Sequence, residues 1–161
     1  MEHRLLIDGW RTNLRFSSCH VLLRHDKCSR LHGHSYGVHL DVRGELDENH
    51  MLVDFGKVKK TIRYIADELD HRTLVPTENP DIRLNVINDG ENLEVSMPDR
   101  KYSFPICDVV KLPIPTTTVE ELSKYLLRRF MEEFQVPDGV SEISLGVDEG
   151  IGQGAWSRWA R

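Results

Sequence analysis

The sequence is poor in the features that mark secreted, membrane-spanning and nucleic-acid-binding proteins. Only three of its 161 residues are cysteine, and this odd set in a chain without a secretory start predicts reduced thiols and no disulfide framework. No stretch approaches the roughly 18 apolar residues of a membrane span, and the start MEHRLLIDGW has no basic region followed by a long apolar run. We therefore expect a cytoplasmic protein without a membrane partner.

The chain also lacks an excess of basic residues. It has 21 Lys and Arg against 26 Asp and Glu, whereas nucleic-acid-binding domains are usually basic, so we expect no nucleic-acid partner. A local basic pocket for a phosphorylated small molecule remains open. Hydrophobic residues at 39% and charged residues at 29% are ordinary for a globular protein. With no repeat or linker, residues 1–161 are predicted to form a single domain.

Hydrophobic periodicity predicts both strands and helices. Alternation of apolar and polar residues is typical of half-buried strands, and apolar residues three or four apart are typical of amphipathic helices. The predicted strands are residues 4–16, 35–43 and the stretch SEISLGVD, and the predicted helices run from 54 to about 70 and from about 119 to 134. Thr118 and Glu121 match a capping box before the second helix. This order predicts an α+β fold with an antiparallel sheet and two helices on one face.

One short stretch, SCHVLLRHDKCSRLHGHSYGVHLDV, holds five of the eight histidines and two of the three cysteines. His32 and His34 lie two residues apart, so in a strand they project from the same face. If the chain folds back near Asp26, His20 lies opposite His32. Three imidazoles with a vacant fourth position are typical of catalytic zinc, although imidazole also suits other divalent metals.

The other residues of this stretch have different expected roles. His25 and His39 are predicted to be solvated, and Cys19 is predicted to be a small core residue. Cys28 has two interpretations: a fourth metal ligand, or a thiolate of lowered pKa that acts as a base or nucleophile. The spacing of the residues does not decide between them.

Six short motifs occur in an order and spacing that resemble a known enzyme family. They are FSSCH, CSRLHGHSY, LVDFGKVKK, LDHRTL, TTVEEL and VDEGIGQGAW. Together they resemble the 6-pyruvoyltetrahydropterin synthase and 6-carboxytetrahydropterin synthase family. The resemblance implies the tunnelling fold (T-fold), in which an antiparallel sheet carries two helices on one face and the sheets join into a barrel across subunits. It also implies a homo-oligomer, a hexamer built as a dimer of trimers, with the active site between protomers.

The resemblance further implies a role for each matching residue. The implied ligands of Zn²⁺ are His20, His32 and His34. The implied catalytic residues are Cys28, which acts as a base, and the proton-relaying pair Asp70 and His71. The implied substrate-binding residues are Glu149, which anchors the pterin ring, and Thr117 and Thr118, which assist it.

The implied activity is that of a zinc-dependent lyase acting on 7,8-dihydroneopterin triphosphate. The spacing Cys-x3-His-Gly-His resembles that of the enzymes that form 6-carboxy-5,6,7,8-tetrahydropterin in queuosine and 7-deazaguanine biosynthesis, with loss of triphosphate and acetaldehyde. Formation of 6-pyruvoyltetrahydropterin and a dihydroneopterin aldolase-like reaction of pterin or folate biosynthesis are the alternatives. A non-catalytic metal- or pterin-binding module is an alternative of another class.

Two features depart from the family pattern. The segment at about 77–112 is longer than the typical connection and has turn signals at Asp89-Gly90 and Pro98-Asp99, which predict an extended β-hairpin or meander. Such an insertion could cap the substrate entrance or extend a subunit contact. Gly150 follows Glu149 where the family usually has Thr. The basic residues that hold the triphosphate stay unassigned.

Overall fold

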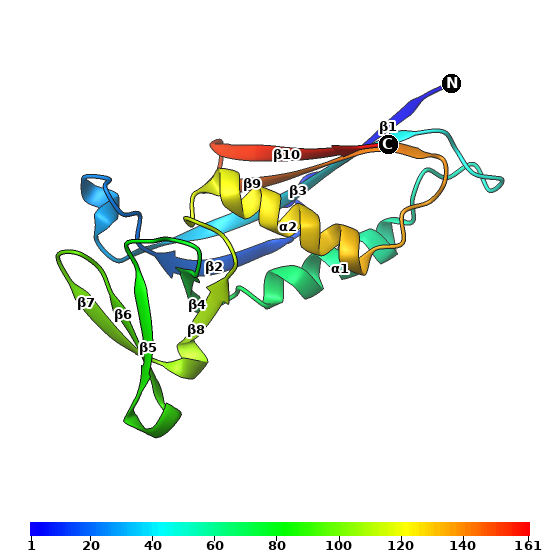
Figure 1. Cartoon of the computed structure of the whole chain (residues 1–161). Coiled ribbons are helices and arrows are strands. Elements are labelled where there is room, and N and C mark those ends of the chain that lie inside the picture. Colours follow the sequence, from blue (N-terminus) through cyan, green and yellow to red (C-terminus); the bar gives the residue numbers. More distant parts are fainter.

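A mixed β-sheet with two helices on one face forms the body of the molecule (Figure 1). The computed structural model describes residues 1–161. The main sheet contains β1 (His3–Ile7), β2 (Arg15–His20), β3 (His32–Gly44), β4 (Arg72–Pro76), β8 (Val109–Leu112), β9 (Val140–Glu149) and β10 (Gly154–Ala160). The helices are α1 (Phe55–Asp67) and α2 (Val119–Glu133). A small second sheet contains β5 (Arg83–Ile87), β6 (Asn92–Ser96) and β7 (Lys101–Pro105), and the 3-10 turns are η1 (Lys27–Ser29), η2 (Asn88–Gly90) and η3 (Ile106–Asp108).

The strand order of the main sheet is β10-β9-β3-β2-β4-β8, with β1 also paired to β3. The pairs from β10 to β2 are antiparallel, and the predicted α+β class with two helices on one face is confirmed. The β2–β4 and β4–β8 pairs are parallel, so the sheet is not antiparallel throughout. Parallel neighbours need a long crossover, which β3 with α1 and the small sheet supply.

The sequence predicted one strand over residues 4–16, and the structure has two. β1 ends at Ile7 and β2 begins at Arg15. Between them the Asp8 carboxylate accepts hydrogen bonds from the backbone amides of Trp10 and Arg11, at 2.9 and 3.2 Å. Aspartate favours such local turns, and the turn breaks the strand although the apolar alternation continues across it.

Both predicted helices are confirmed, with small shifts at their ends. α1 begins after Asp54, whose carboxylate accepts a hydrogen bond from the Lys57 amide at 2.9 Å. α2 begins after Thr118, but the Thr118 side chain makes no capping hydrogen bond, so the predicted capping box does not form. Neither helix combines the length and the apolar character needed to cross a membrane.

The face of the sheet beneath the helices holds the main hydrophobic core. Phe16 of β2 and Tyr36 of β3 are buried and stack with ring centroids 4.7 Å apart. They belong to one cluster with Val58 and Ile62 of α1 and Leu126 of α2. Burial of each such side chain contributes about 1.5 to 3 kcal/mol, so this packing holds β2 and β3 against the two helices.

The opposite face of the sheet carries glycines covered by tryptophan rings. A Cβ atom on Gly37 would lie 2.6 Å from the Trp10 indole, and one on Gly146 would lie 2.5 Å from the Trp156 indole. These glycines are therefore required for the close approach of both rings. We call this side the open face, because neither helix packs on it (Figure 1).

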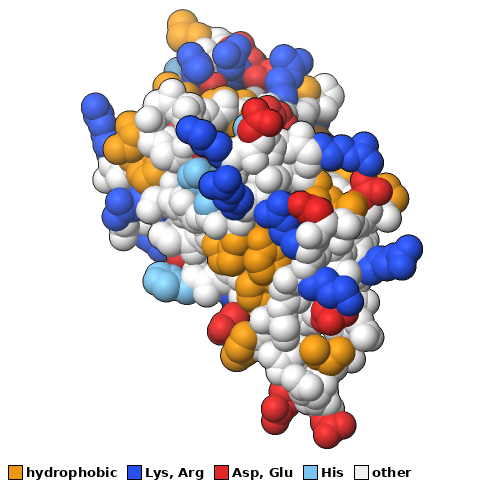
Figure 2. Space-filling view, turned by 90° about the vertical axis from the view of Figure 1, so that its left-hand side faces the viewer, with side chains coloured by type: hydrophobic (Ala, Val, Ile, Leu, Met, Phe, Trp, Pro, Cys, Tyr) orange, Lys and Arg blue, Asp and Glu red, His pale blue; other side chains and the backbone are white.

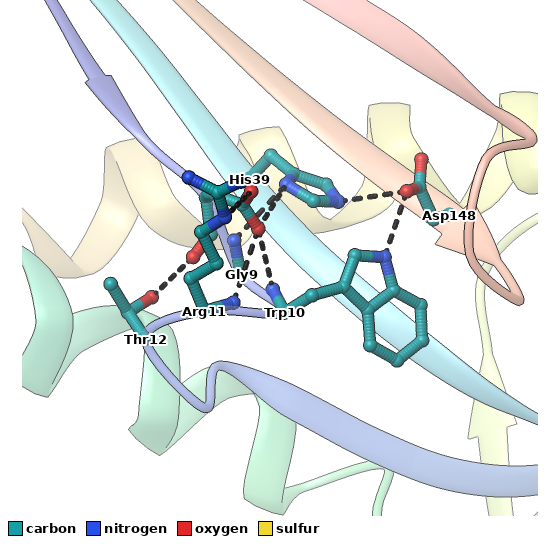
Figure 3. A network of polar contacts seen from close by, with 7 residues as sticks. Gly9, Trp10, Arg11, Thr12, His39 and Asp148 are labelled. Atoms are coloured by element: carbon teal, nitrogen blue, oxygen red, sulfur yellow. Dashed lines mark hydrogen bonds and ion pairs between the residues drawn. The ribbon is translucent and has the colours of Figure 1, made fainter.

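His39 lies on the open face and is buried, so the prediction of a solvated side chain was wrong. Its Nδ1 accepts a hydrogen bond from the Gly9 amide at 3.0 Å, and its Nε2 lies 3.0 Å from Asp148 Oδ2 (Figure 3). Trp10 Nε1 donates to the same carboxylate at 2.9 Å. Strand alternation places His39 on this face correctly, but it does not reveal that the turn after β1 folds over it.

The small sheet of β5, β6 and β7 is an antiparallel meander. Leu93 and Val95 of β6 form a second buried cluster with Val75 of β4 and Val109 of β8. The segment at about 77–112 therefore contains the meander and then returns through β8 to the main sheet. In Figure 2 the molecule narrows toward a lower tip that carries acidic side chains, while Lys and Arg side chains lie over the broader part above.

Candidate active site

Three histidines converge where β2 and β3 meet. His20 is directly opposite His32 in the β2–β3 register, as the sequence predicted, and Ser18 is opposite His34. The ring centroids are 4.7 to 5.3 Å apart. Alternation places the three rings on the helix-covered face with Phe16, and we call them the histidine triad. His25 is exposed, as the sequence predicted.

Backbone carbonyls fix the tautomer of two of these rings. His20 Nδ1 lies 3.0 Å from both the carbonyl oxygen and the side-chain oxygen of Thr117, which is fully buried. His32 Nδ1 lies 2.6 Å from the carbonyl oxygen of Arg30. Because a carbonyl oxygen only accepts, each Nδ1 carries the hydrogen and each Nε2 keeps its lone pair. The Nε2 atoms of all three rings are buried without a hydrogen-bond partner.

Glu149 joins the triad from the end of β9. It is opposite Tyr36 in the β3–β9 register, and its Oε1 lies 2.5 Å from His34 Nε2 and 3.2 Å from His20 Nε2. The neighbouring His20 ring, and then the other two imidazoles, lower the pKa of Glu149 against the effect of burial, which favours its ionised form. Burial lowers the pKa of His34, which favours its neutral form, although the Glu149 charge opposes this effect.

These four groups fit a metal ion. One ligand atom from each of His20, His32, His34 and Glu149 lies within 4.8 Å of the others. Lone pairs of imidazole nitrogens and a carboxylate oxygen repel one another unless a proton or a cation lies between them. Nitrogen and oxygen donors at this spacing suit zinc, and they also suit other divalent metals. The hydrogen bonds at Nδ1 of His20 and His32 are the outer contacts that metal-binding imidazoles usually make.

Cys28 lies in η1, between the two strands of the triad, and is half buried with a free thiol. Its carbonyl oxygen accepts a hydrogen bond from the Leu22 amide at 2.8 Å, which closes the loop of residues 21–31. It is not one of the residues in the candidate metal cluster.

The structure pairs Asp70 with His71 but does not connect this pair to the triad. Asp70 Oδ2 accepts a hydrogen bond from His71 Nδ1 at 2.7 Å, and Asp70 Oδ1 accepts one from the Ser17 amide at 2.7 Å. Partial burial opposes the ionised form, but these hydrogen bonds outweigh it and lower the pKa of Asp70. His71 is exposed, with φ of 56°, a backbone conformation that costs energy outside glycine.

His71 lines a recess of about 640 Å³ on the open face. The recess residues are Ser17, Ser18, Cys19, Gly33, His34, Ser35, His71, Arg72, Thr73 and Asp108. Side chains at 17, 19 and 35 alternate with those of the triad and so point to the other side of the sheet. Cys19 is half buried here, with Sγ 3.1 Å from Thr73 Oγ1, so it is not the core residue that the sequence predicted.

Comparison with known proteins identifies the family. The family model described as 6-pyruvoyl tetrahydropterin synthase matches residues 10–158. The chain belongs to the 6-pyruvoyl tetrahydropterin synthase family. The resemblance drawn from the six motifs is thereby confirmed, and the chain is a member of an enzyme family of tetrahydropterin synthesis.

Relatives in this family carry the name of the carboxy-forming enzyme. A protein of Methanocaldococcus jannaschii, provisionally named 6-carboxy-5,6,7,8-tetrahydropterin synthase, is 34% identical over 157 residues, which are 96% of this chain and 95% of that protein. The 6-carboxy-5,6,7,8-tetrahydropterin synthase of Haemophilus influenzae is 26% identical over 136 residues, which are 81% of this chain and 85% of that protein.

Solved structures of the family share the fold. The 6-pyruvoyl tetrahydropterin synthase of Plasmodium vivax superposes with a TM-score of 0.92 and 26% identity, covering 100% of this chain and 99% of that one. Further structures of that protein carry mutations of a glutamate described as a catalytic residue.

The sequence analysis missed the contact between Glu149 and the triad, and it assigned no role to Tyr36. The Tyr36 hydroxyl is buried without a hydrogen-bond partner. Burial, and then the nearby charge of Glu149, raise the pKa of this hydroxyl far above its usual value. Both features follow from the β3–β9 register, which places Tyr36 opposite Glu149 and cannot be read from a local motif.

Proposed function

We propose that the chain is a zinc-dependent lyase that converts 7,8-dihydroneopterin triphosphate to 6-carboxy-5,6,7,8-tetrahydropterin, with loss of triphosphate and acetaldehyde. The observation that carries the proposal is the convergence of three buried Nε2 atoms without hydrogen-bond partners beside the Glu149 carboxylate. The names of the relatives and the Cys-x3-His-Gly-His spacing support the carboxy-forming branch, and hence a role in queuosine and 7-deazaguanine biosynthesis. A cytoplasmic location stays a prediction.

In this proposal His20, His32 and His34 hold the zinc ion. Bound zinc would make a substrate hydroxyl more acidic, as metal-bound oxygens become. The Thr117 and Arg30 carbonyls accept from Nδ1 of His20 and His32, so their Nε2 lone pairs would be available to the ion.

Cys28 would remove a proton from the substrate side chain, and the Asp70–His71 pair would relay protons. Asp70 holds the Nδ1 hydrogen of His71, which leaves the exposed Nε2 free to exchange a proton. Because His71 lines the recess on the open face, we propose that the pair serves the site of another protomer. A homo-oligomer with sites between protomers, the hexamer expected from the family, accommodates this arrangement.

Glu149 would hold the pterin ring, since an ionised carboxylate accepts two N–H bonds from a flat heterocycle. Thr117 and Thr118 would assist it. Thr117 also contacts His20, so it would connect the pterin site to the metal site. Thr118 lies beside it at the start of α2.

Formation of 6-pyruvoyltetrahydropterin is the second candidate, because the P. vivax structure carries that name. That protein has a catalytic glutamate. The residues between Cys28 and His32 of this chain are Ser, Arg and Leu, so a glutamate is absent there. This difference favours cysteine chemistry and the carboxy product over the pyruvoyl and aldolase-like alternatives.

Product analysis tests the proposal. The purified protein with zinc is incubated with 7,8-dihydroneopterin triphosphate, and the product is identified by mass spectrometry. We expect 6-carboxytetrahydropterin and acetaldehyde. Cys28→Ala should abolish turnover and keep about one zinc per chain, whereas the matched Cys107→Ala, at an exposed position, should leave both unchanged. A different pterin product would contradict the branch assignment, and binding without conversion would support the non-catalytic module.

A further inference from the structure

The loop of residues 21–31 carries Cys28 but has almost no core of its own. Val21 is its one buried residue, and η1 contains none. Three backbone hydrogen bonds lie within it, from Leu22 to the Cys28 carbonyl at 2.8 Å, from Ser29 to the His25 carbonyl at 2.9 Å and from Arg30 to the Lys27 carbonyl at 3.2 Å. Arg24 has φ of 62°, a conformation that non-glycine residues keep only when surrounding contacts hold it. The shape of the loop therefore depends on contacts from outside.

Two such contacts come from the segment that contains the meander. Arg100, in the turn between β6 and β7, donates from Nη1 to the carbonyl oxygen of Ser29 at 2.8 Å. Asp81, just before β5, forms an ion pair with Arg24. The contacts reach the loop on either side of Cys28. In Figure 1 the loop beside the end of β2 and the meander lie at the same end of the molecule.

The meander is a firm support for these contacts. Its second core of Leu93 and Val95 packs on Val75 and Val109, so it is anchored to the main sheet. Arg100 is itself oriented by Asp99, which accepts from Nε at 3.1 Å and from Nη2 at 2.5 Å. A guanidinium held in this way loses less conformational freedom when it binds the Ser29 carbonyl.

We infer that the meander positions the Cys28 loop, with Arg100 and Asp81 as positioning residues. The catalytic meaning of the inference rests on the proposed role of Cys28. The loop continues to Arg30, whose carbonyl orients His32 at 2.6 Å. The contacts from Arg100 and Asp81 therefore support a single loop that carries Cys28 and orients one histidine of the triad.

Hydrogen exchange and thiol labelling test this inference without requiring turnover. In Arg100→Met, exchange at the Leu22 and Ser29 amides should rise about tenfold, the effect of losing one such hydrogen bond. Alkylation of Cys28 by iodoacetamide should accelerate, while alkylation of Cys107 in the same sample should not. Arg83→Met, at an exposed position on β5, is the matched control and should leave both measurements unchanged.

A second variant and a kinetic measurement complete the test. Asp81→Asn should raise exchange at the same loop amides with an intact meander, and Arg100→Lys should restore part of the protection. With substrate, Arg100→Met should lower kcat about tenfold, leaving KM and zinc content unchanged. Exchange and labelling in Arg100→Met and Asp81→Asn equal to those of Arg83→Met would overturn the inference. Failure of the wild-type chain to convert the substrate would overturn the proposed function. It would not decide this inference, since hydrogen exchange and thiol labelling are measured without turnover.

Discussion

The two faces of the main sheet each bury histidine beside a carboxylate from the end of β9, with opposite results. On the open face, His39 Nδ1 accepts a hydrogen bond from a backbone amide, and its Nε2 faces Asp148. On the helix-covered face, backbone carbonyls accept hydrogen bonds from Nδ1 of His20 and His32, which leaves a lone pair on each Nε2 beside Glu149. The kind of backbone group at Nδ1 thus separates a histidine that completes the fold from one that can bind a metal.

The sharpest test of this contrast is zinc content. Replacing His32 with Ala should reduce bound zinc from about one per chain to nearly none, because the ion would keep only two of its three proposed histidine ligands. Replacing His39 with Gln should leave the zinc content unchanged. Metal analysis of the dialysed proteins by mass spectrometry measures both. Equal zinc loss in the two variants would remove the distinction between the faces.

The two adjacent carboxylates offer the next test. Glu149→Gln should reduce kcat/KM by about 10- to 100-fold while zinc remains bound. This factor corresponds to the free energy that a hydrogen bond to a charged group contributes. Asp148→Asn should change kcat/KM much less. Steady-state kinetics with metal analysis decides the role of Glu149, since loss of zinc in Glu149→Gln would make it a ligand rather than a pterin anchor.

The free energy of unfolding should depend on the open-face histidine, whose substitution is expected to leave zinc content unchanged. His39→Leu should lower the free energy of unfolding by about 1 to 3 kcal/mol, because the buried Gly9 amide loses its acceptor. His25→Leu, at an exposed position, should stay within about 0.5 kcal/mol of the wild type. Urea unfolding of the zinc-free proteins measures both. A His39→Leu variant as stable as the control would show that the open-face network contributes little.

The smallest effect is expected at the exposed histidine–carboxylate pair. The folded-state pKa of Asp70 is lowered, so this carboxylate stabilises the protein above its unfolded pKa of about 3.9, and that contribution is lost as pH falls through the lower folded value. Solvent screening keeps the contribution small. Unfolding curves from pH 5 to pH 2 should therefore show a shallower acid loss in Asp70→Asn than in the wild type. Equal slopes would mean that the Ser17 and His71 contacts add nothing to stability.

Local patterns predicted the triad well and its surroundings poorly. His20 and His32 could be paired because a chain that folds back near Asp26 fixes their register within a few residues. Glu149 reaches the triad only through the pairing of β3 with β9, strands far apart in the chain. Its assignment from the sequence came from the family resemblance, and its contact with the histidines required the fold.

The same limit explains the errors in the fold. The two helices follow from spacing that lies within each segment, whereas the parallel placement of β4 and β8 depends on how distant segments pack. His39 was predicted to be exposed because nothing in its own strand indicates that the turn at Asp8 covers it. Contacts between the meander and the Cys28 loop were likewise beyond local patterns, since Arg100 and Ser29 are distant in sequence.

The position of Asp148 and Glu149 on successive residues of β9 makes the length of that strand a shared constraint. Because side chains alternate between faces, insertion or deletion of one residue before them would turn each carboxylate to the opposite face, so neither His39 nor the triad would keep its present partner. The packing of Trp156 on Gly146 would be displaced by the same shift. A point substitution can change one face without the other, but a change in the length of β9 would alter both faces at once.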